Sequence, residues 1–117
     1  MMISGVHHVS INVDDLEATR AFYVDTLGFE LLPRPDLGIA GAWLGMADGR
    51  QLHLIEGTVP PGLGQHFALH VADIDTAIAE LRSGGLEVSD PSAFPDGARQ
   101  AFLSDPSGNL VELNQPA

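Results

Sequence analysis

The side chains in this chain that are best suited to binding a metal ion occur at corresponding places in an internal repeat. The hexapeptide that starts at His8 (HVSINV) matches the hexapeptide that starts at His66 (HFALHV). Later in each half, GRQLHL matches GNLVEL, which aligns His53 with Glu112. Imidazole and carboxylate groups both bind divalent metals. A pseudo-twofold axis that superposes the halves could bring all four side chains together, so the repeat predicts a metal site of His8, His53, His66 and Glu112.

The ligand set indicates which ions would bind. Three imidazoles and one carboxylate suit one divalent ion, Zn, Ni, Co, Mn or Fe(II), with positions left open for water or substrate. No short-spaced motif such as HExxH is present, so the prediction depends on the fold. Taken alone, a histidine in a strand is more often a surface or hydrogen-bonded residue, and Glu112 alone is a solvated carboxylate. The correspondence across the repeat is what favours metal binding.

The elements that must position these residues follow from hydrophobic periodicity. Residues 6–13 alternate, with Val9, Ile11 and Val13 on one side and His8, Ser10 and Asn12 on the other, which is the pattern of a half-buried strand. Asp14 and Asp15 are N-cap candidates for a helix that ends at Gly28. Three further strands are predicted in this half, over residues 29–32, 40–46 and 51–56, with an Asp48-Gly49 turn between the last two.

The second half repeats this order. Residues 66–71 predict a strand, Asp73 caps a helix whose apolar face is Ile74, Ala77, Ile78 and Leu81, and Gly84-Gly85 ends that helix. Strands are predicted over residues 86–88, 98–103 and 109–114. The predicted fold class is therefore α+β, with two βαβββ modules in a pseudo-twofold arrangement and the helices outside a mixed sheet.

The length of 117 residues fits one domain over residues 1–117. The first module covers about residues 1–57 and the second about residues 65–117. The segment 57–64 between them has two prolines and three glycines, which is typical of a linker.

The strand alternation also predicts which side chains meet. Four of the five histidines fall on the strand faces without helices, together with Glu112. His7 precedes its strand and faces the other way, so it is interpreted as structural or exposed. His70 is equivalent to Asn12 in the repeat. It lies further along its strand than the candidate ligand His66, which predicts a supporting or exposed position.

Composition excludes several classes of function. Sixteen acidic residues against five basic ones give a formal net charge of −11, which argues against nucleic acid or an anionic membrane as partner. The absence of cysteine excludes disulfides and thiolate metal sites. No apolar run approaches the ~20 residues of a membrane span, and no signal-peptide pattern is present, so a cytoplasmic location is expected.

These residues resemble the vicinal oxygen chelate superfamily over essentially the whole chain. The group includes glyoxalase I, methylmalonyl-CoA epimerase, extradiol dioxygenases, fosfomycin-modifying thiol transferases and bleomycin-resistance proteins. The resemblance is carried by residues 8–17 (HVSINVDDLE), Phe22-Tyr23, Leu27-Gly28-Phe29, His66, residues 71–75 (VADID) and residues 102–113 (FLSDPSGNLVEL). It implies that paired βαβββ modules form a cup of strands around one metal, with His8, His53, His66 and Glu112 at the ligand positions.

The resemblance implies a metal-dependent lyase or isomerase whose small substrate chelates the metal through neighbouring oxygens. The metal would act as a Lewis acid, and Glu112 is the candidate general base. Glyoxalase I carries Glu or Gln where this chain has His53, and no glutathione-binding segment is identified. Two alternatives stay open. One is an Fe(II)-dependent extradiol-type dioxygenase that uses His8, His66 and Glu112. The other is a metal-free drug-binding protein of the bleomycin-resistance type.

Further side chains are candidates for substrate binding. Arg34 and Arg99 could each hold a substrate carboxylate, although a solvated loop position is the alternative for both. Trp43 could line the mouth of the cleft or belong to the core. Asn12 and His70 complete this set on the helix-free faces.

A homodimer is also expected. A cup that is open on one side leaves sheet edges and an apolar rim uncovered, which favours a symmetric pair. A monomeric mass by light scattering at micromolar concentration would contradict this expectation.

Overall fold

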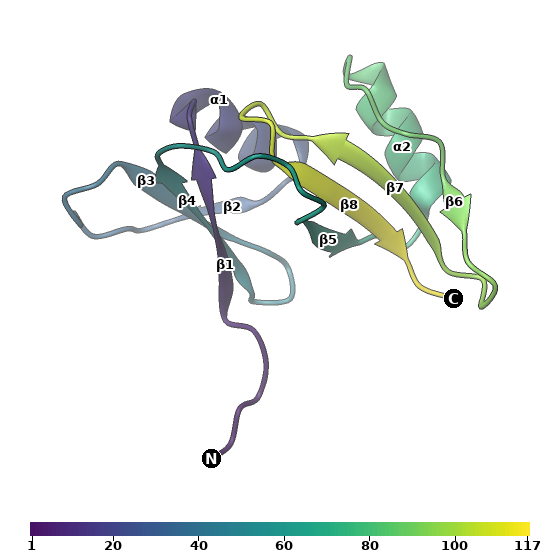
Figure 1. Ribbon diagram of the computed structural model, residues 1–117, viewed down its shortest axis with the longest axis horizontal. Helices are drawn as coiled ribbons and strands as arrows, with labels where there is room; N and C mark the ends of the chain where they lie inside the picture. Colours follow the sequence, from purple (N-terminus) through teal and green to yellow (C-terminus); the bar gives the residue numbers. More distant parts are fainter. The chain divides into compact units, whose positions relative to one another are not determined.

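The computed structural model covers residues 1–117 and divides into two compact units, Met1–Pro61 and Gly62–Ala117 (Figure 1). The boundary falls inside the segment 57–64 that the sequence predicts as the connection between the modules. Each unit has its own mixed four-stranded sheet.

The first unit follows the predicted order β-α-β-β-β. Its elements are β1 (His8–Val13), α1 (Leu16–Ala21), the π-helix η1 (Phe22–Thr26), β2 (Glu30–Leu32), β3 (Gly41–Gly45) and β4 (Gln51–Glu56). The strand order is β1-β4-β3-β2, and β1 and β4 are parallel while the other pairs are antiparallel. The carboxylate of Asp15 caps α1 by accepting a hydrogen bond of 3.1 Å from the backbone N–H of Ala18.

The second unit has the same topology. Its elements are β5 (Phe67–His70), α2 (Ile74–Ser83), β6 (Ser92–Ala93), β7 (Arg99–Ser104) and β8 (Leu110–Gln115), in the strand order β5-β8-β7-β6. Asp73 caps α2 through the N–H of Thr76. The predicted α+β class and the βαβββ order of both modules are confirmed.

The helices give each sheet a covered face and a helix-free face. Helix α1 contacts β3 and β4, and α2 contacts β7 and β8. Leu44, Leu52 and Leu54 are fully buried on the covered face of the first sheet, and burying each stabilises the fold by about 1.5–3 kcal/mol. On β1, His8, Ser10 and Asn12 are exposed while Val13 is buried. The alternation read from the sequence therefore places the polar side chains on the helix-free face, as predicted.

The first helix differs from the prediction in its second half. The sequence predicts one regular helix up to Gly28, but the backbone widens into a π-helix, and the N–H of Leu27 donates to the carbonyl of Phe22, five residues back. The adjacent side chains of Phe22 and Tyr23 are both buried there, with ring centroids 5.0 Å apart.

The predicted strand over residues 86–88 is wrong. The strand that pairs with β7 is the short β6, and the preceding segment lies beside β7 without a regular ladder. The N–H of Phe102 donates to the hydroxyl of Ser89 (2.8 Å), and the carbonyl of Val88 accepts from Arg82 (2.8 Å). The N–H of Ser89 donates to the carbonyl of Phe102 (2.9 Å), so one backbone bond to β7 is made and side chains supply the other partners.

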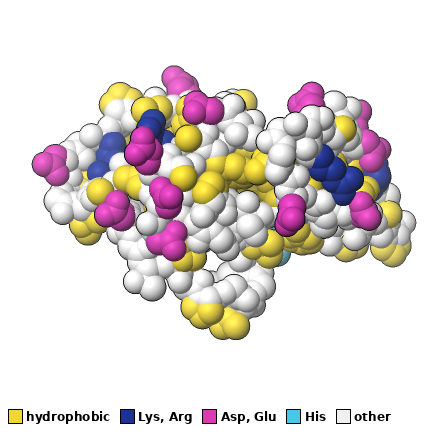
Figure 2. Space-filling model, turned by 90° about the horizontal axis from the view of Figure 1, so that it is seen from above, with side chains coloured by type: hydrophobic (Ala, Val, Ile, Leu, Met, Phe, Trp, Pro, Cys, Tyr) yellow, Lys and Arg dark blue, Asp and Glu magenta, His cyan; other side chains and the backbone are white.

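Asp and Glu side chains are scattered over the face of the molecule seen in Figure 2, in keeping with the acidic composition. Neither α-helix is long and apolar enough to cross a membrane.

Candidate functional site

In the first unit, two of the predicted ligands lie against each other on the helix-free face. His8 and His53 come from the parallel neighbours β1 and β4, and their rings stack with centroids 4.0 Å apart and planes 13° apart. Trp43 is the β3 partner of His53, and its ring stacks on His53 at 4.7 Å. Because β4 lies between β1 and β3, His53 is packed between the other two rings and is only 9% exposed. Trp43 thus contacts a candidate ligand directly.

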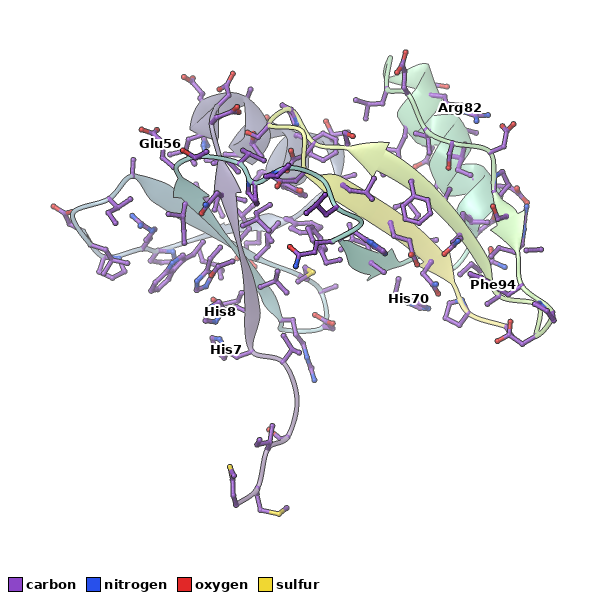
Figure 3. All side chains as sticks on the ribbon, in the orientation of Figure 1. His7, His8, Glu56, His70, Arg82 and Phe94 are labelled. Atoms are coloured by element: carbon purple, nitrogen blue, oxygen red, sulfur yellow. The ribbon has the colours of Figure 1, made fainter.

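Two neighbours bind the ring nitrogens of this pair. Nε2 of His53 lies 2.9 Å from Oε1 of Gln51, and Nδ1 of His8 lies 2.9 Å from Nδ1 of His7. His7 is exposed, as predicted, but it contacts His8, and Figure 3 shows the two side by side at the start of β1. Burial lowers the pKa of His53, and electrostatic interactions with His8, His7 and Arg34 lower it further. A lowered pKa favours the neutral imidazole, which is the form that binds metals.

In the second unit, the other two predicted ligands form a hydrogen-bonded pair. Nε2 of His66 lies 3.0 Å from Oε1 of Glu112. Glu112 is 7% exposed, so it is not the solvated carboxylate that it would be in isolation. Nδ2 of Asn114, two residues along β8, donates to the second carboxylate oxygen Oε2 at 2.9 Å. The carboxylate is therefore held at both oxygens.

The protonation state of His66 follows from its partners. Its Nδ1 lies 2.8 Å from the carbonyl oxygen of Gly64, so both ring nitrogens face acceptors. The hydrogen bond to Gly64 raises the pKa of His66 above its ordinary value of 6.5, and Glu112 raises it further, against the opposing effect of burial. A histidine that donates Nδ1–H to a carbonyl presents Nε2 to a metal once that nitrogen has lost its proton. Nε2 and the Glu112 carboxylate then form a pair of donors for a cation.

The structure thus gathers the four predicted ligands as two pairs, one in each unit. No group of three or more His, Asp or Glu side chains placed to hold a metal is found in the chain. The donor chemistry of the pairs fits a divalent metal, since one pair offers two imidazoles and the other an imidazole with a carboxylate. Gln51 and Asn114 were missed by sequence reasoning. The signal that could have found them is their position two residues from His53 and Glu112, which puts them on the same strand face.

Three of the predicted substrate-binding residues lie elsewhere or have other partners. Arg99 donates two hydrogen bonds, of 2.8 and 3.0 Å, to the carboxylate of Asp75 on α2. It therefore lies on the helix-covered side of β7, and we drop it from the site. Asn12 donates to the carbonyl of Thr58 (2.9 Å) and anchors the segment that follows β4. His70 is exposed at the end of β5 (Figure 3). Arg34 and Trp43 remain on the helix-free face of the first unit.

Comparison with known proteins gives a consistent result. The family model of the Glyoxalase/Bleomycin resistance protein/Dioxygenase superfamily matches residues 5–113. The lactoylglutathione lyase of Haemophilus influenzae is 30% identical over 119 residues, which cover 91% of this chain and 88% of that protein. The structure of a glyoxalase family protein from Bacillus anthracis matches with a TM-score of 0.88 and 31% identity, covering 100% of this chain and 98% of that one. TnmS3, an antibiotic binding protein from Streptomyces, matches with a TM-score of 0.86 and 36% identity, covering 100% and 99% of the two chains.

Proposed function

The chain belongs to the Glyoxalase/Bleomycin resistance protein/Dioxygenase superfamily, and on that premise we propose that it is a metal-dependent lyase or isomerase. Its substrate is a small molecule with two neighbouring oxygen atoms. In this proposal the donors to the divalent ion are the four predicted ligands, His8, His53, His66 and Glu112.

The observation that carries the proposal is the arrangement around His66 and Glu112. Gly64 fixes the orientation of the imidazole, and Asn114 holds the far oxygen of the carboxylate. Supporting hydrogen bonds of this kind orient metal ligands in proteins, and they are not needed by a solvated surface pair. A buried carboxylate without such partners would be costly.

The residues of the proposed site would have the following roles. When bound, a divalent ion polarises substrate oxygens as a Lewis acid. Glu112 is the proposed general base, and it accepts a substrate proton at Oε1 while Asn114 holds Oε2. His53, packed between His8 and Trp43, keeps its imidazole in place on the sheet. His53 and Glu112 are equivalent in the repeat but differ in their acid-base chemistry. This difference assigns proton transfer to Glu112, in the second unit.

A second candidate is a small-molecule binding protein without catalysis. The observation that favours it is the similarity to TnmS3, an antibiotic binding protein. The stacked rings of Trp43, His53 and His8 give the helix-free face an aromatic surface that such a ligand could contact.

Metal titration separates these candidates. We expect calorimetric titration of metal-free protein, purified without an affinity tag, to show about one site per chain for at least one of Ni, Zn, Co and Mn. Elemental analysis of the protein as purified would identify the native ion. If none of these ions binds more tightly than ~0.1 mM, the metal-dependent proposal fails and the binding-protein candidate takes its place.

A further inference from the structure

Arg34 is a cation without a carboxylate partner in a chain that has sixteen acidic residues and five basic ones. Arg82 pairs with Asp90 at 2.9 Å and Arg99 pairs with Asp75 at 2.8 Å. Arg34 makes one hydrogen bond, from Nη2 to the carbonyl oxygen of Ile39 at 2.9 Å. Its Nε is buried and has no hydrogen-bond partner. The guanidinium thus keeps donor capacity that the protein itself does not use.

The guanidinium of Arg34 lies directly on the first sheet, where Gly41 makes room for it. A Cβ atom at Gly41 would clash with the backbone carbonyl oxygen of Leu54, and it would lie 2.9 Å from Nη2 and 3.1 Å from Cζ of Arg34. The next residue, Ala42, is buried on the helix-covered side, so Gly41 belongs to the helix-free face. Trp43 lies on that same face and stacks on His53. Arg34 therefore places its positive charge on the face that carries His8 and His53.

The chemistry of this position favours an oxyanion. A buried N–H without an acceptor is unfavourable, and a ligand oxygen that reached it would remove that cost. The planar guanidinium donates two parallel hydrogen bonds to a carboxylate or phosphate, which an ammonium group cannot match. An acidic chain repels anionic ligands, so it needs a local cation where one binds.

We propose that Arg34 binds a carboxylate or phosphate group of the substrate on the helix-free face of the first unit, beside His8 and His53. The inference rests on the proposed function for the identity of the ligand as a substrate. It narrows the substrate class to small molecules that carry an anionic group in addition to the neighbouring oxygens.

The test uses metal-free protein and two probes, inorganic phosphate and acetate. Binding is followed in NMR spectra through the Arg34 Nε–H signal of the wild type and through the indole N–H signal of Trp43, the one tryptophan in the chain, which the Arg34 variants keep. The Arg34 signal is expected to shift saturably with at least one probe, and the probe that binds identifies the anion as phosphate or carboxylate. Arg34→Gln is expected to abolish binding of the probe. Arg34→Lys is expected to weaken it by about 10-fold, because lysine keeps the charge but cannot donate two parallel hydrogen bonds. Arg50→Gln is the matched control. Arg50 is exposed and donates to its own turn at Asp48, so this variant should bind the probe like the wild type.

The proposal is overturned if Arg34→Gln binds both probes as the wild type does, or if neither probe moves the Arg34 signal of the wild type. Metal titration of Arg34→Gln keeps this result separate from the proposed function. Arg34 is not a metal ligand, so Arg34→Gln should still bind about one metal ion per chain, although loss of its charge near His53 changes the affinity. Anion binding through Arg34 in a protein that binds no metal would support the anion site while the metal-dependent activity fails.

Discussion

Replacement of Glu112 by glutamine is expected to lower turnover by ~100-fold or more while most of the metal stays bound. Glutamine keeps the size of the side chain and one oxygen donor, but it cannot accept a proton at neutral pH. The measurement is kcat, together with the metal content of the same sample. Substrates would come from screening 2-oxoaldehyde–thiol adducts, acyl-CoA epimers and catechols.

Glu56→Gln is the matched control for this variant. Glu56 is an exposed residue at the end of β4 (Figure 3), and the same change of charge there should leave turnover near the wild-type value. If Glu112→Gln retained full activity, Glu112 would not be the base, and the proton-transfer role proposed for the second unit would have to be abandoned. Loss of activity together with loss of the metal would instead assign Glu112 a ligand role alone.

Strand alternation was sufficient to predict which side chains share a face. His8 and His53 meet because β1 and β4 are parallel neighbours, and their register puts the polar side chains of both strands on the same face. The His66–Glu112 pair follows from the same logic in β5 and β8. The shared face needed only period 2 and the repeat, which are properties of the sequence, whereas the two pairs follow from the strand neighbours that the structure shows.

Features that depend on side-chain geometry were not predictable in this way. The first helix widens after Ala21 through a local bond from the N–H of Leu27 to the carbonyl of Phe22. The irregular segment before β6 is held by a tertiary hydrogen bond between Phe102 and Ser89. Arg34 and Arg99 looked equivalent in the sequence, and the structure separates them. Arg99 shares the strand phase of the buried Ala101 and Leu103, which places it on the helix side. The position of Arg99 in that alternation could be predicted from the sequence, whereas the lack of a carboxylate partner for Arg34 could not.

Replacement of His66 by alanine is expected to weaken metal binding by ~100-fold or more, because it removes one donor directly and leaves Glu112 without its imidazole partner. His70→Ala provides the control, since His70 is exposed at the end of β5 and makes no hydrogen bond or ring contact. Calorimetric titration of both variants and the wild type at one pH gives the comparison. Equal losses in the two variants would mean that histidine content, and not the position of His66, governs the affinity.

The pH dependence of binding gives an independent measure of the same group. In the metal-free protein the pKa of His66 is raised, chiefly by the hydrogen bond to Gly64, so the ring holds its second proton up to a higher pH than an ordinary histidine. A metal must displace that proton from Nε2. Wild-type affinity should therefore fall as the pH is lowered through the raised pKa of His66, and binding should release a proton there. His66→Ala has no such proton to lose, so its residual affinity should fall less steeply over this range. If both proteins showed the same slope, His66 would not be the group with which the metal competes.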